Sequence, residues 1–135
     1  MSLSDFAEKK VNDKLFGAVD FTPPANYYIA LATAQPGEDG TIAEANYGGY
    51  ARQQFANNKT NFTSAASDGN ATITNNTEAR FPTNTLGSNT ITHCALFDAL
   101  TGGNMYAWGQ LSISKIYAVG DRPVFEVGSM TFTVD

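Results

Sequence analysis

The sequence predicts a mainly β protein: an antiparallel β-sandwich or jelly roll of about eight short strands with one N-terminal helix. Three observations support this class. Only 16% of the 135 residues are charged, against about 25% in an average domain, and the chain is instead rich in Asn, Thr, Ser and Gly. Apolar and polar residues alternate most clearly at residues 90–97 and 130–134. Turn-forming residues separate the alternating segments at short intervals.

Residues 4–16 form the one segment with a helical pattern. Ser4 or Asp5 can cap its start, and Gly17 is a natural stop. Apolar residues recur at every fourth position and define one stripe: Leu3, Ala7, Val11 and Leu15. We expect a helix at residues 1–17 that packs on its own domain; the alternative is a helix that extends from the domain to dock on a partner.

The remainder of the chain, residues 18–135, is expected to form a single β-sandwich domain. A chain of this length can bury roughly two-thirds of the surface that it exposes when unfolded. Two long polar loops, at 34–49 and 57–70, interrupt the strands, and loops of this length are usually functional or mobile. The predicted strands cover residues 27–33, 50–55, 71–74, 79–81, 90–97, 105–111, 113–119, 124–127 and 130–134.

Charge and hydropathy exclude several partners. The net charge of −5 disfavours nucleic acid, which requires a basic face, and it also disfavours an anionic membrane surface. No apolar run reaches the roughly 20 residues of a membrane span. Cys94 is the single cysteine, so no disulfide can form within the chain. We therefore expect synthesis in a reducing cytoplasm, with no nucleic acid and no membrane as partner.

Residues that could carry catalysis are scarce. His93 is the single histidine, and its neighbour Cys94 points to the opposite face of a strand, so the two cannot act together. We expect no catalytic residue, no cofactor and no metal ligand. One acidic loop leaves alternatives open, because Glu38, Asp39 and Glu44 could hold a weak Ca²⁺ or supply a glycosidase carboxylate. That loop lacks the ligand spacing of an EF-hand, and acidic loops are more often simply solvated.

Aromatic residues are the remaining candidates for a functional surface. Alternation along the strands turns some of these rings away from the local core, where a protein or carbohydrate partner could cover them. The alternative is that they pack at the edges of the sheets. The candidate interface residues are Tyr28, Tyr47, Tyr50, Tyr106, Trp108 and Tyr117.

Several blocks of sequence carry a resemblance to a known family. The first is Pro-Ala-Asn-Tyr-Tyr-Ile-Ala-Leu-Ala-Thr-Ala-Gln-Pro-Gly at residues 24–37. The others lie at residues 48–53, 81–83, 91–99, 101–104, 108–111, 120–121 and 125–135. In this order the blocks resemble small structural proteins of tailed bacteriophages that are often labelled phage tail fibre proteins. The resemblance spans residues 24–135.

The resemblance implies a structural component of the virion, made in the cytoplasm of the host bacterium, to which no catalytic residues carry over. Because the chain has no fibrous shaft, the first hypothesis is a capsid decoration (cement) subunit that binds the major capsid protein and stabilises the assembled head. The alternatives are a tail fibre or tail-tip module that binds host glycan or other tail proteins, and a carboxylate-based glycan hydrolase. The resemblance further implies a homo-oligomer, specifically a trimer, because decoration proteins and fibre heads tend to sit on threefold axes.

Overall fold

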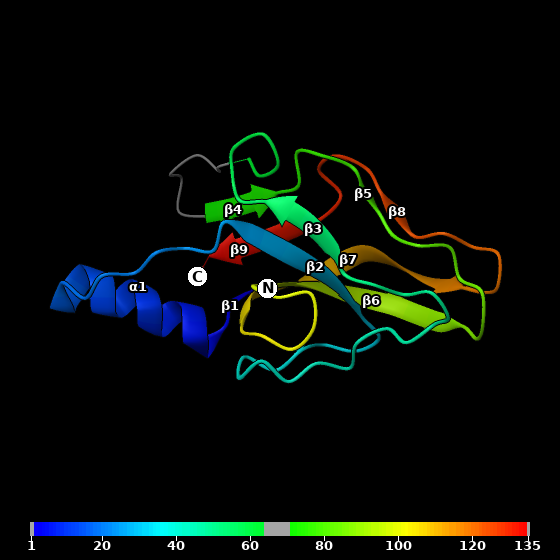
Figure 1. Cartoon of the computed structure of the whole chain (residues 1–135), viewed down its shortest axis with the longest axis horizontal. Helices are drawn as coiled ribbons and strands as arrows, with labels where there is room; N and C mark the ends of the chain where they lie inside the picture. The colour runs from blue at the N-terminus through cyan, green and yellow to red at the C-terminus, as the bar shows by residue number, and fades with distance from the viewer. Residues whose placement is uncertain (1, 64–70, 135) are drawn as a thin grey trace.

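The computed structural model describes residues 2–63 and 71–134, and its largest element is a five-stranded antiparallel sheet (Figure 1). The strand order across the sheet is β1-β7-β6-β2-β3. Its strands are β1 (Ser2–Leu3), β2 (Asn26–Ala32), β3 (Gln53–Ala56), β6 (Asn89–Phe97) and β7 (Met105–Tyr117). The turn between β6 and β7 contains Gly102 and Gly103 with φ of 60° and 77°, a conformation that glycine adopts without steric cost.

Two short ribbons form the layer opposite this sheet. β4 (Ala71–Thr74) pairs with β9 (Thr131–Val134), and β5 (Ala79–Arg80) pairs with β8 (Val124–Phe125). Every strand pairing in the described part of the chain is antiparallel. The predicted class, mainly antiparallel β with one N-terminal helix, is therefore confirmed. The second layer is two separate ribbons rather than one continuous sheet.

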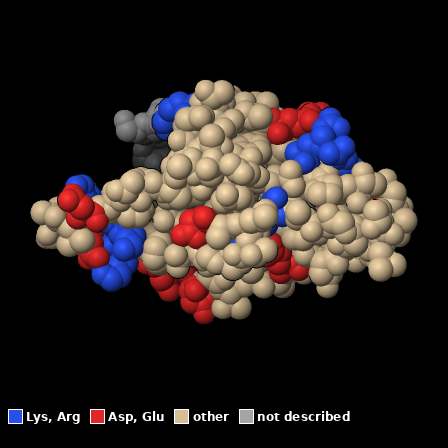
Figure 2. All heavy atoms as spheres, viewed as in Figure 1, with Lys and Arg blue, Asp and Glu red and all other residues tan. Residues whose placement is uncertain are grey.

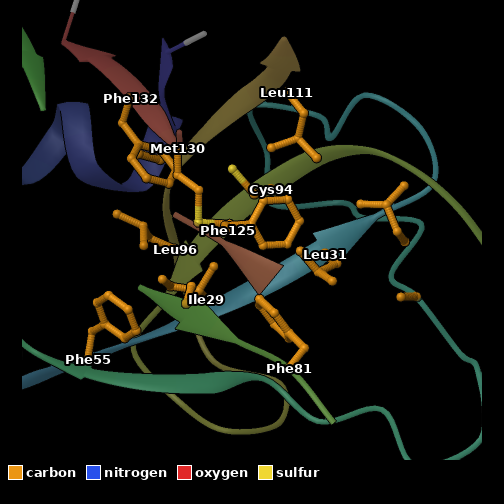
Figure 3. Close-up of a cluster of buried hydrophobic side chains, with 14 of the residues drawn as sticks. Ile29, Leu31, Phe55, Phe81, Cys94, Leu96, Leu111, Phe125, Met130 and Phe132 are labelled. Atoms are coloured by element: carbon orange, nitrogen blue, oxygen red, sulfur yellow. The ribbon is translucent and has the colours of Figure 1, made fainter. Parts of the chain in front are cut away.

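The main core lies between the sheet and the ribbons (Figure 3). Full burial of each large apolar side chain contributes roughly 1.5–3 kcal/mol, so this cluster supplies much of the stability of the fold. The sheet contributes Ile29, Leu31, Phe55, Cys94, Leu96 and Leu111, and the opposite layer contributes Phe81, Phe125, Met130 and Phe132.

The outer face of the sheet is covered by the loop at residues 33–49. Ala30 and Ala95 are fully buried on this face, and their small side chains let the loop lie close to the strands. The loop follows the edge of β2: the Thr33 amide donates to the Ala43 carbonyl at 2.9 Å, and the Ala45 amide donates to the Leu31 carbonyl at 2.8 Å. The predicted loop at 34–49 is thus irregular but packed. Residues 64–70 of the other predicted loop lie outside the described residues.

The segments predicted as separate strands at 105–111 and 113–119 are one strand, β7. No glycine or proline occurs at residues 110–119, so the backbone stays extended past Ser112. The irregularity is a bulge: Ile91 lies opposite Lys115 and His93 opposite Gln110, so β6 advances by two residues (93 − 91) while β7 advances by five (115 − 110). The extra residues bend this part of β7 away from the regular ladder.

Two buried asparagines join the irregular segments of the second layer. The Asn84 side chain donates to the carbonyls of Gly87 (2.8 Å) and Tyr117 (3.1 Å) and accepts from the Leu86 amide at 2.8 Å. Asn75 has the same role at the ribbon β4–β9. Its amide donates to the carbonyls of Thr77 and Glu126, and its oxygen accepts from the Met130 amide, each at 2.9 Å. Both side chains are almost wholly buried, so each replaces strand pairing where the ribbons end.

Helix α1 (Asp5–Gly17) is held to the sheet only at its first turn. Ser4 is the N-cap: its hydroxyl accepts from the Ala7 amide at 3.2 Å and donates to the Met105 carbonyl. Ala7 is the one buried residue of the helix, and β1, just before it, pairs with β7. The helix ends at Gly17, the predicted stop, and Ala18 follows as its C-cap with φ 51°. The remaining turns project from the body of the protein (Figure 1).

Replacing Asn84 with Ala should lower the free energy of unfolding by about 2–4 kcal/mol, because the Leu86 amide and two carbonyls lose their buried partner. Asn12→Ala, at an exposed position of α1, is the matched control and should change stability by less than about 0.5 kcal/mol. Urea unfolding of both variants measures the difference. Equal stabilities for the two variants would show that Asn84 does not anchor the second layer.

Candidate docking surface

Four of the six aromatic residues predicted to form an interface are buried within this chain: Tyr47, Tyr106, Trp108 and Tyr117. The expectation that such rings would be exposed is wrong for these four. The loop at 33–49 covers the outer sheet face and encloses Trp108 together with Phe97 and Met105. Tyr47 and Tyr117 belong to the main core, and Tyr106 packs against Phe6. Tyr28 and Tyr50 are half-buried. An interface role for this set stays a prediction, and only these two rings have appreciable exposed surface to offer.

His93 and Cys94 occupy opposite faces of β6, as the sequence predicts. The Cys94 thiol lies 3.7 Å from the Gly109 carbonyl in the main core, and burial raises its pKa to about 12. On the outer face, the His93 ring is 5.9 Å from the Trp108 ring, and its Nδ1 lies 2.7 Å from the Thr92 hydroxyl. Burial lowers the pKa of His93. The thiol is therefore protonated and sequestered, and the imidazole is held neutral in packing.

Glu44, from the predicted acidic loop, is part of a polar cluster with Arg52 and Tyr50. The Arg52 guanidinium makes a two-pronged contact with the Glu44 carboxylate, at 2.9 Å from Nε and 2.8 Å from Nη2. Tyr50 donates its hydroxyl to the same carboxylate at 2.8 Å, and burial raises the pKa of that hydroxyl. Because these side chains turn inward, β3 begins at Gln53 rather than at the predicted residue 50.

Arg52 also fastens the turn between β6 and β7. Its Nη1 donates to the carbonyls of Ala99 and Gly102, both at 2.8 Å, and its guanidinium carbon lies 3.9 Å from the centre of the Phe97 ring. Every part of the guanidinium thus has a partner within the chain. We conclude that this cluster is structural.

The other carboxylates of the acidic loop do not converge on Glu44. Asp39 accepts the Thr41 amide at 3.0 Å, and this hydrogen bond lowers the pKa of the Asp39 carboxyl. Within residues 2–63 and 71–134, no three His, Cys, Asp or Glu side chains come close enough together to hold a metal ion.

The far end of α1 is an exposed apolar surface, as is the C-terminal end of β7 with Ile113 and Ile116. We call α1 and the returning segment at residues 18–25 the arm. Leu15 and Phe16 are 68% and 86% exposed, and Val11 and Val19 are also exposed. Uncharged atoms cover the extreme end of the helix in Figure 2, whereas Lys and Asp or Glu alternate nearer the body. Such a concentration of exposed apolar side chains is a candidate interaction site.

The arm is firmly positioned at its base. Phe6 meets Tyr106 edge to face with ring centres 5.4 Å apart, and Phe21 stacks on Tyr106 with ring centres 6.3 Å apart. Lys10 lies above both phenylalanine rings. Ion pairs between Lys9 and Asp13 (2.5 Å) and between Lys14 and Asp20 (3.1 Å) line the exposed surface, where each contributes little. Aromatic packing therefore fixes the direction in which the apolar end points.

An apolar pocket of about 430 Å³ opens beside the base of the arm. Its wall includes Leu3, Phe62, Leu96 and Phe132, and its rim carries Asn57, Asn58 and Lys59. Tyr27 and Tyr106 form part of the lining with ring centres 5.3 Å apart. Burial raises the pKa of Tyr27 to about 12, so the hydroxyl stays neutral. The pocket can accept an apolar group and offers polar contacts only at its edge.

Comparison with known proteins gives this surface its context. A family model described as "Podophage GP4 fiber I protein gp80" matches residues 2–133. This chain belongs to that family. No curated protein matches the chain. The phage tail fibre-type resemblance that the sequence suggested for residues 24–135 is confirmed, and the family match extends through the N-terminal arm.

Membership in this phage fibre family makes the chain a structural component of the virion. In the described part of the chain, no helix has the length and apolar character needed to cross a membrane. Sequence reasoning missed two parts of the surface: Phe16, which lies off the predicted stripe, and the pocket, whose wall comes from strands far apart in the chain. The one available signal for Phe16 was a large aromatic residue directly before the predicted helix stop at Gly17.

The burial of His93 predicts a specific pH dependence of stability. Because its pKa is lowered in the folded chain, the unfolded chain binds a proton more readily below about pH 6.5, and stability falls as the pH falls through this range. His93→Gln should remove this contribution. Urea unfolding at about pH 5 and pH 7.5 should show a smaller difference for the variant than for the wild type. An unchanged difference would contradict the assignment.

Proposed function

We propose that the chain is a non-catalytic subunit of a phage fibre and that it acts by associating with other virion proteins through the arm. The observation that carries this proposal is the exposed apolar end of α1. Leaving Leu15 and Phe16 in water forgoes roughly 1.5–3 kcal/mol for each side chain, a cost that association removes. Membership in the fibre family supports the same role.

A fibre position is proposed in place of the capsid decoration role that was the first hypothesis from sequence. The family description names a fibre protein, and no observation on this chain favours the head. The compact β-domain would form the fibre-associated body, with the arm as its contact. A role in binding host glycan receives less support, because the rings expected to bind it are largely within the core.

The absence of catalysis is supported by the state of the reactive side chains. The Cys94 thiol and the His93 imidazole are separated by the sheet, and the Glu44 carboxylate is occupied by Arg52 and Tyr50. The acidic net charge of −5 supports protein partners over nucleic acid. We retain the homotrimer as the proposed assembly, since low surface charge favours close contact between copies.

Phe16→Asp should prevent incorporation into virions, because a charged side chain cannot be buried in an apolar contact without a partner. Val127→Asp is the matched control. Val127 is also exposed, at 59%, but it follows β8 in the ribbon layer and is not part of the arm. Both variants should keep the wild-type circular dichroism spectrum. The test is complementation of phage lacking the protein, followed by quantification of the protein in purified particles.

The same purified particles also show where in the virion the protein lies and in how many copies. Copies confined to the fibres, in low number, are the expected result. Hundreds of copies distributed over the shell would contradict the fibre role and restore the decoration hypothesis. Normal incorporation of Phe16→Asp would show that the arm is not the point of association.

A further inference from the structure

We draw no further inference here: the strongest candidate, the exposed edge of β7 at residues 112–116 with the apolar side chains of Ile113 and Ile116, carries none, because nothing in the structure shows what covers it.

Discussion

The structure depends on one constraint: among the described residues no continuous sheet faces the five-stranded sheet on either side, so irregular chain completes both covering layers. Backbone amides and carbonyls in such chain are costly to bury without partners. Asn75 and Asn84 supply those partners on the ribbon side, each with three hydrogen bonds from one side chain. On the other side Arg52 holds the turn after β6 through two carbonyls. These buried polar side chains replace the strands that a full sandwich would have.

The same constraint explains why the arm is free. The core lies between the sheet and the ribbons, and the loop at 33–49 covers the outer face, so neither layer of the sheet depends on α1 for its cover. The helix is therefore attached only through its first turn, by the Ser4 cap and by the packing of Phe6 on Tyr106. The apolar end of the helix is exposed and does not contribute to the core of the single chain. A protein that functions by assembly can use this exposed apolar end for contact with a partner.

Much of the fold follows from local sequence patterns, and the exceptions have physical causes. Alternation at residues 90–97 and 130–134 predicted β6 and β9 closely, since side chains of a half-buried strand must alternate. The bulge in β7 interrupts the regular pairing but contains no turn. The sequence pattern therefore predicted two strands where the structure has one. The burial of Tyr106 and Trp108 depends on residues distant in sequence, which periodicity cannot register. For the same reason the asparagine anchors looked like ordinary loop residues, and the pocket could not be predicted.

The central claim is that the far end of α1 is uncovered in the isolated chain and covered in the assembled fibre. Hydrogen–deuterium exchange of the α1 amides, in the monomer held at low concentration and in purified virions, tests it most directly. We expect fast exchange over the last two turns of α1 in the monomer and strong protection of the same amides in virions, while β6 is protected in both. Equal exchange of these turns in the two states would contradict it.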